Sequence, residues 1–464
     1  MTECKTKRFE FHALSNRKVI GHFEGGDISS DAGGLLLREV EQRTGILKQF
    51  AECFTDYRKQ EWIEHPVQDL LAQKAYAICL GYEDLNDHDQ LRADLGLAVM
   101  VGKTDPKGEH RIESRNRGKA LAGKSTLNRL ELTPAGSPAA ERYNKIVYAP
   151  GAIDELLVTL FLESHRKAPQ SIVLDLDATD TPLHGKQEAR FFHGYYNHYC
   201  YLPLYIFCGD QLLCARLRPS NIDASAGSRE EVERIVTQIR KAWPYTQIIL
   251  RADSGFCREE LMAWCEKHAV DYVFGFARNP RLRRKIAREM RQAKKEQQRT
   301  GEPARVFCEF FYQTRKTWSQ SRRVVAKAEQ IPGKENPRYV VTSLSPSAWP
   351  AQELYERLYC ARGEMENRIK EQLSLFSDRM STESLRANQL RLYFSSLAYV
   401  LVEALRRVGL AGTEGAELQV ETIRLRLLKI AAQVRITARK IWIRYTKAYP
   451  WKNIFVSAWA ALRC

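Results

Sequence analysis

Two short apolar runs that each end in an aspartate are the feature that most restricts the fold of this chain. Residues 171–177 read Ser-Ile-Val-Leu-Asp-Leu-Asp, and residues 247–253 read Gln-Ile-Ile-Leu-Arg-Ala-Asp. Short runs rich in β-branched and aliphatic residues predict buried strands. In open α/β sheets, ligands bind at the carboxyl ends of the strands. The sequence therefore predicts two strand ends that each present a carboxylate, Asp177 and Asp253.

The elements expected around these two runs alternate between strands and helices. The regularly spaced apolar residues of 152–165 predict an amphipathic helix before the first run. After that run we expect, in order, strand 199–207, turn 208–210, strand 212–217, helix 229–243, strand 247–252, helix 258–268 and strand 271–276. An antiparallel hairpin joined to parallel strands, with helices on the faces, is the order of a ribonuclease-H-like fold. The sequence therefore predicts an α/β core of that kind.

A third acidic residue is predicted on a helix further along the chain. Residues spaced by 4, 3, 4 and 4 positions line one face of this helix, and an adjacent apolar stripe would pack on the sheet. The first set is Tyr355, Tyr359, Arg362, Glu366 and Lys370, and the apolar set is Leu354, Leu358, Ala361, Met365 and Ile369. Glu364 lies about 200° round the helix from Glu366, so both cannot face one site. Glu366 shares its face with Arg362 and Tyr359 and is the better candidate.

Changes of pattern along the chain divide it into five segments. They are a mainly helical N-terminal region, the first part of the α/β core, a basic β-rich insertion, the second part of the core and a C-terminal region, at 1–150, 151–278, 279–348, 349–410 and 411–464. The insertion would form an inserted sheet from strands at 306–312, 322–328 and 338–344. The C-terminal region is expected to be helical, except that 434–445 alternates apolar with basic residues and predicts a strand with one basic edge.

The chain carries a large positive charge. Its 464 residues hold 72 Lys and Arg against 56 Asp and Glu, a formal net charge of +16. The simplest meaning is attraction to a polyanion, because neutralised phosphates release their condensed counterions. A membrane surface would require charge of the same sign. Residues 278–299 hold ten Lys or Arg against two Glu. We favour a phosphate-binding surface there, with Arg284 and Lys285 as candidates, over a merely solvated helix face.

The cysteines and the chain's hydropathy bear on where the protein works. The 11 cysteines, an odd number without a C-x-x-C pair, predict buried reduced thiols rather than a disulfide framework. The N-terminus lacks an apolar signal segment. The longest uncharged apolar stretch, 392–402, is far shorter than the roughly 20 residues that a membrane span needs. We therefore expect a soluble, intracellular protein.

The three predicted acids and the basic chain together suggest metal-dependent chemistry on nucleic acid. Mg²⁺ and Mn²⁺ prefer carboxylate and water ligands. Two ions about 4 Å apart can activate an attacking oxygen and stabilise the leaving one. Asp175 and Asp177 share a face of their strand, and Asp177 is preferred because it lies closer to the strand end. Asp180 in the following loop is a further candidate. For any single acid the ordinary interpretation, a solvated carboxylate, is the stronger one, and only the set favours a site.

These residues resemble those of DDE-type insertion-sequence transposases, and in particular the bacterial insertion sequence thirteen-eighty group. The resemblance covers about residues 20–450. It rests on Asp177-Ala178-Thr179, the segment 251–256 and the helix pattern Tyr359-x2-Arg362-x3-Glu366, with support from segments 81–87, 183–187 and 201–204.

The resemblance implies a ribonuclease-H-like core with a β-rich insertion, Mg²⁺-dependent nicking at transposon ends and attack of the freed 3′-hydroxyl on target DNA. Asp177, Asp253 and Glu366 would hold two ions, for which Mn²⁺ could substitute. Arg362 and Tyr359 would contact DNA near the cut, and Lys370 would stand in for a lysine that relatives carry where this chain has Leu373. The partners implied are terminal inverted repeats, target DNA and a second copy of the chain, in the bacterial cytoplasm at the nucleoid. The N-terminal region would bind DNA ends or mediate dimerisation.

Other patterns favour competing interpretations. Residues 118–125 match the P-loop pattern, but 110–117 is too polar to be the buried strand that precedes a P-loop. We expect instead that Ser125 caps a helix over 126–132 and that Lys124 meets DNA phosphate. His184, His193 and His198 lack a zinc spacing and are expected to border the site or to contact DNA.

Two alternatives to a transposase therefore remain. A non-catalytic, sequence-specific DNA-binding or architectural protein would use the same basic surfaces without cutting DNA. A P-loop nucleoside triphosphatase would depend on Lys124.

Overall fold

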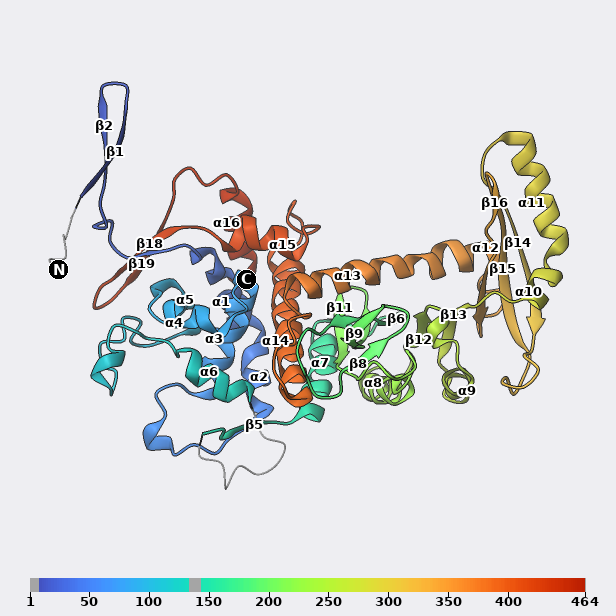
Figure 1. Cartoon of the computed structure of the whole chain (residues 1–464), viewed down its shortest axis with the longest axis horizontal. Coiled ribbons are helices and arrows are strands. Elements are labelled where there is room, and N and C mark those ends of the chain that lie inside the picture. The colour runs from blue at the N-terminus through green and yellow to red at the C-terminus, as the bar shows by residue number, and fades with distance from the viewer. Residues whose placement is uncertain (1–7, 133–142, 464) are drawn as a thin grey trace. The chain divides into compact units, whose positions relative to one another are not determined.

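The computed structural model describes residues 8–132 and 143–463 (Figure 1). The chain forms two compact units. The first unit contains the residues up to Val147 together with those from Leu401 onward, and the second unit is Tyr148–Val400. All three predicted acids lie in the second unit. We describe each unit by itself.

The second unit is built on a large mixed sheet, which confirms the predicted α/β class. Among the described residues this sheet has nine strands in the order β11-β10-β6-β12-β13-β17-β15-β14, with β16 paired to β15. The strands are β6 (Ser171–Ala178), β10 (Leu204–Cys208), β11 (Gln211–Arg216), β12 (Gln247–Ala252), β13 (Asp271–Phe276), β14 (Ala304–Tyr312), β15 (Arg322–Ile331), β16 (Lys334–Glu335) and β17 (Arg338–Thr342). β6, β12 and β13 run parallel, and the remaining pairings are antiparallel.

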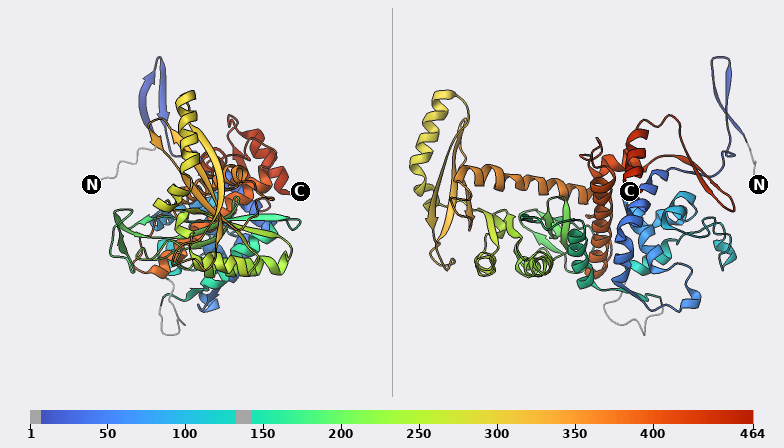
Figure 2. Two further views of the ribbon diagram at one scale, coloured as in Figure 1. Left: turned by 90° about the vertical axis from the view of Figure 1, so that its right-hand side faces the viewer. Right: turned by 180° about the vertical axis from the view of Figure 1, so that it is seen from behind.

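Helices cover both faces of the sheet. They are α7 (Pro150–Glu163), α8 (Ser228–Ala242), α9 (Glu259–Lys267), α10 (Pro280–Lys285), α11 (Ala287–Thr300), α12 (Ala351–Glu353), α13 (Gly363–Ser374) and α14 (Leu385–Ala404). The predicted helices at 152–165, 229–243 and 258–268 are confirmed as α7, α8 and α9. The basic run at 278–299 forms α10 and α11, and α11 lies along β14 and β15 (Figures 1 and 2).

Three strand predictions need correction. The strand expected at 199–207 is two strands, β9 (His198–Tyr201) and β10, because Pro203 lies between them and has no N–H to donate to a ladder. β9 instead joins a small sheet with β7 (Thr181–Pro182) and β8 (Phe191–His193). The insertion does not form a sheet of its own, since β17 pairs with β13 and extends the core sheet. The strand expected at 434–445 is a hairpin of two strands in the first unit.

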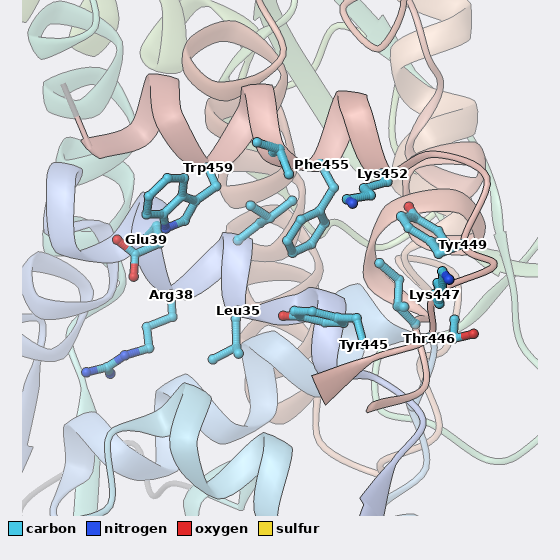
Figure 3. Close-up of a pocket in the computed structure, with 13 residues that line it drawn as sticks. Leu35, Arg38, Glu39, Tyr445, Thr446, Lys447, Tyr449, Lys452, Phe455 and Trp459 are labelled. Atoms are coloured by element: carbon cyan, nitrogen blue, oxygen red, sulfur yellow. The ribbon is translucent and has the colours of Figure 1, made fainter. Parts of the chain in front are cut away.

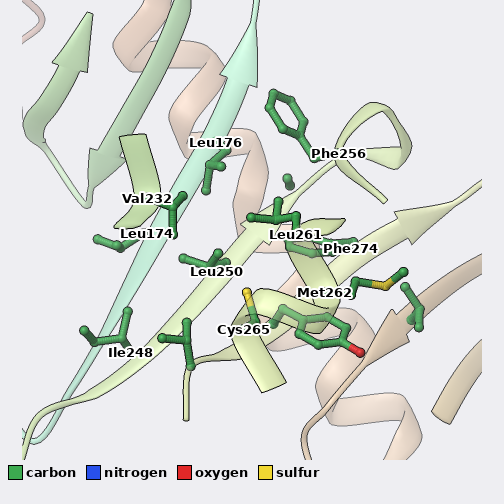
Figure 4. Packing of buried hydrophobic residues seen from close by; sticks show 14 of the residues in the cluster. Leu174, Leu176, Val232, Ile248, Leu250, Phe256, Leu261, Met262, Cys265 and Phe274 are labelled. Atoms are coloured by element: carbon green, nitrogen blue, oxygen red, sulfur yellow. The ribbon is translucent and has the colours of Figure 1, made fainter. Parts of the chain in front are cut away.

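Alternation along the strands explains why the two faces of the sheet differ. Leu174, Leu176, Ile248 and Leu250 point to one face and pack against α7, α8 and α9 in the main apolar core (Figure 4). Their chain neighbours point to the other face, where Ile249 packs in a second core beneath the segment 354–358. Because side chains alternate with period two, Asp175, Asp177 and Arg251 also face this second core.

The segment that carries Glu366 is helical but not regular. A π-helical turn, η7 (Leu354–Tyr359), and a short 3-10 turn, η8 (Cys360–Arg362), connect α12 to α13. The predicted apolar stripe is largely confirmed, because Leu354, Leu358, Met365 and Ile369 are buried. A π turn resets the phase of a helix and leaves a carbonyl without its usual α-helical partner.

An ion pair between adjacent strands holds this helix on the sheet. Asp175 and Arg251 are direct ladder partners on β6 and β12. The Nε and Nη2 atoms of Arg251 donate to the two carboxylate oxygens of Asp175 at 2.5 and 2.7 Å. Its Nη1 atom donates to the carbonyl of Leu358 in the π turn at 2.6 Å. Arg251 and Asp175 are only 6% and 3% exposed, so strand β12 is connected to the helix through a buried guanidinium that makes three hydrogen bonds.

The first unit is mainly helical, as predicted for the N-terminal region. Its helices are α1 (Leu35–Thr44), α2 (Ile46–Glu52), α3 (Val67–Leu80), α4 (His88–Leu91), α5 (Leu95–Val101), α6 (Lys124–Glu131), α15 (Val420–Ile423) and α16 (Lys452–Arg463). Its strands are β1 (Phe9–Leu14), β2 (Arg17–Gly21), β3 (Ile28–Ser29), β4 (Phe54–Asp56), β5 (Ile146–Tyr148), β18 (Ala432–Ile436) and β19 (Ile441–Tyr445). The cysteines at the described positions are free, as predicted. No helix within 8–132 and 143–463 is both long and apolar enough to cross a membrane.

We expect Arg251→Met to lower the free energy of unfolding by about 3 to 5 kcal/mol, because it leaves the buried Asp175 carboxylate without its partner. Urea titration measures this loss. The matched control is Arg258→Met, since Arg258 pairs with Asp223 at 2.7 Å but both side chains are about half exposed. Its loss should stay below about 1 kcal/mol. Equal losses in the two variants would contradict the role given to the buried pair.

Candidate active site

Asp177 lies at the end of β6, on the face of the sheet that the Glu366 helix covers. Its Oδ1 atom accepts the backbone N–H of Ala178 at 2.9 Å, and its Oδ2 atom accepts Nη1 of Arg362 at 3.1 Å. Burial raises the pKa of Asp177 to about 6, partly offset by the charge of Arg362. The charges of Asp253 and Glu366 push this pKa in the same upward direction as burial. The ionised form of Asp177 is therefore disfavoured, and a nearby positive charge would stabilise it.

Arg362 connects the strand end to the helix. Besides Asp177, its guanidinium contacts Glu366, with Nη2 at 3.2 Å from Oε1. Burial disfavours the charge of Arg362, but Asp177, Tyr359, Asp253 and Glu366 together raise its pKa. The side chain of Glu366 is about half exposed, with a relative accessibility of 52%. The predicted phase of the helix is thus reproduced, because Arg362 and Glu366 face the same strand end.

Asp253 occupies the turn directly after β12. It caps the 3-10 turn η6 (Ser254–Phe256), and its Oδ1 atom accepts the backbone N–H of Gly255 at 2.8 Å. Its charge acts on Asp177, Tyr359 and Arg362. Arg362 therefore contacts one strand-end acid and the helix acid, and the second strand-end acid, Asp253, acts on it through its charge.

The two aspartates of β6 have different partners. Asp175 is engaged by Arg251 within the buried ion pair, whereas Asp177 reaches Arg362 and the group around it. None of the ion pairs found among the described residues involves Glu364, which is exposed. Geometry thus separates Asp177 from Asp175 and Glu366 from Glu364.

The donor set suits a hard cation, although the carboxylates are not gathered around a common point. Within 8–132 and 143–463, no group of three or more His, Cys, Asp or Glu side chains is close enough to hold a metal ion. Arg362 lies where Asp177 and Glu366 converge and supplies the positive charge there. A buried carboxylate with a raised pKa and two further acids are oxygen donors of the kind that Mg²⁺ and Mn²⁺ prefer.

A pocket of about 500 Å³ opens beside Asp253. Its lining combines polar, basic and aromatic side chains and includes Asp253, Arg278, Lys334, Asn336, Arg338, Tyr339, Tyr355 and Tyr359. Gly275 forms part of its floor, where an added Cβ would lie 2.6 Å from the Tyr359 hydroxyl and 2.9 Å from the Ser254 nitrogen. The absence of a side chain at Gly275 is what lets Tyr359 approach the turn that carries Asp253.

Histidines border the site without forming a cluster. His198 Nε2 lies 2.7 Å from Asp180 Oδ2, so Asp180 has a side-chain partner of its own. His193 packs on Tyr196 with ring centroids 4.9 Å apart. Burial raises the pKa of Tyr196 to about 12, and Asp180 and Asp177 add to the shift, which places this tyrosine near the acids.

The other predicted contact residues lie outside this group. Lys370 is exposed one turn beyond Glu366, and Arg284 and Lys285 are exposed at the end of α10. Lys285 Nζ lies 5.2 Å from the ring centre of Phe310. Leu373 is 37% exposed.

The P-loop interpretation fails on its structural context. No strand lies between 102 and 123, a stretch that the structure describes in full, and the helix α6 begins at Lys124 itself. Gly123 is its N-cap, so the expectation that Ser125 caps a helix starting at 126 was wrong by two residues. Lys124 Nζ contacts Asn86 Oδ1 at 3.1 Å and Asp89 Oδ2 at 3.5 Å.

A second pocket, also about 500 Å³, lies in the first unit (Figure 3). Apolar and aromatic side chains dominate its lining, including Leu35, Tyr445, Phe455, Val456 and Trp459. Its charged groups are Arg38, Glu39, Lys447 and Lys452. With a single carboxylate, it lacks the acid chemistry of the site around Arg362.

Sequence reasoning missed two residues that build the site. Arg251 was noted only as part of the run 247–253, and Gly275 was not singled out. A basic residue in the middle of a buried run is a signal that a buried acid lies opposite, and it could have identified the partner of Asp175.

Comparison with known proteins is consistent with this geometry. A family model described as transposase DDE domain group 1 matches residues 11–464. The structure of the piggyBac transposase synaptic complex with hairpin DNA is similar over 86% of this chain and 80% of that chain, at 11% identity and a TM-score of 0.41. No curated protein matches the chain. Because the family model spans nearly the whole sequence, the chain belongs to the DDE transposases of group 1.

Proposed function

We propose that this transposase cuts the ends of an insertion sequence and joins them to target DNA, with Asp177, Asp253 and Glu366 as its catalytic acids. The observation that carries the proposal is that Arg362 contacts both Asp177 and Glu366 and feels the charge of Asp253, which lines a basic, aromatic pocket. Asp177 rather than Asp175 would be the first ligand, because Asp175 is already neutralised by Arg251.

DDE transposases use divalent metal ions, and we propose that Asp177, Asp253 and Glu366 would hold two Mg²⁺ ions, with Mn²⁺ as a substitute. Such ions supply activation of the attacking oxygen and stabilisation of the leaving oxygen. The chain's own contribution is to keep the acids together before loading. Arg362 does this by donating to Asp177 and Glu366. Once a cation neutralises those acids, the guanidinium is free to donate to a DNA phosphate.

The reaction proposed has two steps, a hydrolysis followed by a transesterification. Water first attacks the phosphodiester at the element's end, so the P–O3′ bond breaks and a 3′-hydroxyl is released. That hydroxyl then attacks a target phosphodiester and displaces the target's own 3′-oxygen. Each step makes one P–O bond for each that it breaks, so no external energy source is required. Asp177, Asp253 and Glu366 would hold the element-end phosphate in the first step and the target phosphate in the second, at the same site.

The pocket beside Asp253 suits the nucleotide next to the cut. Tyr355 and Tyr359 offer ring faces, and Arg278 and Arg338 offer charge for the adjoining phosphates. Tyr359 would stack on a displaced base while Arg362 holds the phosphate. Lys370, Arg284, Lys285 and Lys124 would contact the duplex further away.

The proposal also covers the type of core fold, the family subgroup and the oligomeric state. The strand order β11-β10-β6-β12-β13, an antiparallel hairpin followed by parallel strands, supports a ribonuclease-H-like core. The Tyr359-x2-Arg362-x3-Glu366 pattern supports membership of the insertion sequence thirteen-eighty group. We further propose a homodimer that brings two terminal inverted repeats together at the bacterial nucleoid. Of the five segments predicted from sequence, 1–150 would bind DNA ends or mediate dimerisation. Segments 151–278 and 349–410 would form the catalytic core, 279–348 would be its insertion and 411–464 would be the C-terminal region.

Replacing any one catalytic acid should abolish cleavage while leaving DNA binding intact. We expect Asp177→Asn, Asp253→Asn and Glu366→Gln each to lower Mg²⁺-dependent nicking of a duplex that carries the element's end by more than about a hundredfold. The basis is that replacing a residue that only hydrogen-bonds to a metal ligand already lowers metal affinity or activity about ten- to a hundredfold. Gel assays of nicking and of strand transfer measure this effect.

The matched control is Glu364→Gln, which removes an exposed carboxylate two residues from Glu366 and should nick as the wild type does. Wild-type activity in any one of the three acid variants would refute that residue's assignment. Salt-sensitive binding without nicking by the wild-type chain, with either metal, would favour the non-catalytic DNA-binding alternative.

The raised pKa of Asp177 predicts a site that destabilises the metal-free protein. With a folded-state pKa of about 6 against an ordinary value of 3.8, the folded protein holds more protons than the unfolded chain between these values. Stability therefore falls as pH rises through that window. Asp177→Asn removes this titration, so above about pH 6 we expect it to increase the free energy of unfolding by about 1 to 3 kcal/mol.

Calorimetry across the pH range tests this expectation and its metal dependence. Mn²⁺ should raise the melting temperature of the wild type but not of Asp177→Asn, because only a folded site with the carboxylate binds the ion. Glu364→Gln serves again as the control and should follow the wild type in both measurements. If the stability of wild type and Asp177→Asn changes in parallel with pH, the buried, raised-pKa carboxylate is not present.

A further inference from the structure

The C-terminal part of the chain is basic to an unusual degree. Residues 422–464 contain ten Lys or Arg and no Asp or Glu. No internal acid therefore offsets the charge of this segment, which contributes ten of the sixteen net positive charges of the chain. Each basic side chain of this segment that has no acidic partner in the first unit must therefore be stabilised by solvent or by an external anion.

Much of this charge is displayed on the hairpin formed by β18 and β19. Arg435 is the ladder partner of Trp442, and Gln433 is the ladder partner of Arg444. Because directly opposite residues share a face, these four side chains form one surface, which we call the hairpin face. All four are exposed, Trp442 by 48%. Arg439 and Lys440 extend the same charge to the exposed tip.

The opposite side of the hairpin is fixed to the first unit. Ala432 and Val434 are buried, and Val434 N–H donates to the carbonyl of Asp27 at 2.8 Å. Tyr445 donates its hydroxyl to the carbonyl of Ala32 at 3.0 Å and packs on Phe455 with ring centroids 5.2 Å apart, at the edge of the pocket in Figure 3. The hairpin is therefore held by its apolar side and presents its basic side outward.

The basic side is free to bind an external partner. No ion pair among the described residues involves Arg435, Arg439, Lys440 or Arg444. The turn is closed by its own backbone and by Thr437, whose hydroxyl donates to the carbonyl of Lys440 at 2.8 Å. Lys440 Nζ lies 5.5 Å from the ring centre of Trp442, which leaves the tip cations next to an exposed aromatic face.

We propose that the hairpin face binds duplex DNA, at a site in the first unit that is additional to the catalytic residues of the second. A two-stranded β ribbon fits the major groove of B-DNA, and its outward side chains can reach base edges and flanking phosphates. Arg435 and Arg444 suit phosphate or guanine contacts, and Trp442 suits apolar contact with the sugar or base. Ala432 and Val434 are buried in the first unit, and Ile441 and Trp442 are the large apolar side chains that the hairpin exposes. This apolar area is small for insertion into a membrane, and binding to an anionic membrane is the competing outcome of the test. The inference rests on the proposed function in taking DNA as the polyanion.

The test measures binding to a short fluorescent duplex of arbitrary sequence by anisotropy, with the full-length chain, without divalent metal and over a range of salt. We expect Arg435→Gln/Arg444→Gln to weaken binding by about tenfold or more. The slope of log affinity against log salt should become shallower by about 2, since two phosphate contacts are lost. Trp442→Ala should weaken binding with an unchanged slope.

The matched control is Lys241→Gln/Lys267→Gln, which removes two exposed charges from α8 and α9 and should bind as the wild type does. Arg439→Gln/Lys440→Gln removes two charges from the tip alone. If the Arg435→Gln/Arg444→Gln variant unfolds, this tip variant replaces it in the test and should likewise weaken binding and make the salt slope shallower. Equal affinity and equal salt slope in all variants would overturn the proposal. The proposal would also be overturned if the Arg435→Gln/Arg444→Gln variant lost binding to phosphatidylserine vesicles but bound the duplex as the wild type does.

The catalytic proposal and this one fail separately. If the wild type nicks DNA and the hairpin variants bind duplex normally, only the hairpin site is refuted. If no protein nicks DNA but duplex binding still depends on Arg435 and Arg444, the catalytic proposal is refuted and the hairpin site stands.

Discussion

The buried contact of Arg251 with Asp175 and with the carbonyl of Leu358 is the interaction on which the site depends. It connects two neighbouring parallel strands and the π turn that lies over them, with three donors of one guanidinium used at once. Desolvation makes such a pair costly unless every hydrogen bond is made, so its geometry tolerates little displacement. Arg362 follows Leu358 by four residues and Glu366 follows Arg362 by four. Where the carbonyl of Leu358 is fixed, the approach of Arg362 to Asp177 is fixed as well.

Alternation along the strands made much of this predictable. The runs 171–177 and 247–253 have a single period of two, so the strands, their ends and the shared face of Asp175 and Asp177 could be inferred from sequence. The register between the strands could not, because both runs are apolar enough to pair in several ways. Only that register sets Arg251 opposite Asp175 and so distinguishes the two aspartates. The preference for Glu366 over Glu364 needed only helix periodicity, and it survived the π turn because that turn ends before Arg362.

The strand predictions that were wrong have different physical causes. The hairpin over Ala432–Tyr445 turns at Thr437–Lys440, a stretch without Gly, Pro, Asn or Asp, so its alternation looked like one strand. The break at Leu202–Pro203 does carry a sequence signal, since proline cannot donate to a ladder, although the flanking aromatic residues favour a strand. The extension of the core sheet by β17 depends on pairing over more than sixty residues of chain, which no local pattern encodes.

Electrostatics gives the two units complementary tasks. In the second unit, burial and neighbouring acids raise the pKa of Asp177, and among the described residues the cation in contact with it is Arg362. A buried carboxylate in this state destabilises the metal-free protein. Binding of a divalent cation would offset that destabilisation. In the first unit the imbalance has the opposite sign, with basic side chains on the hairpin face and no acid after Glu421 to pair with them. Under the proposed function, DNA would supply the negative charge that the hairpin face lacks, and a divalent cation would supply the positive charge that the acids lack.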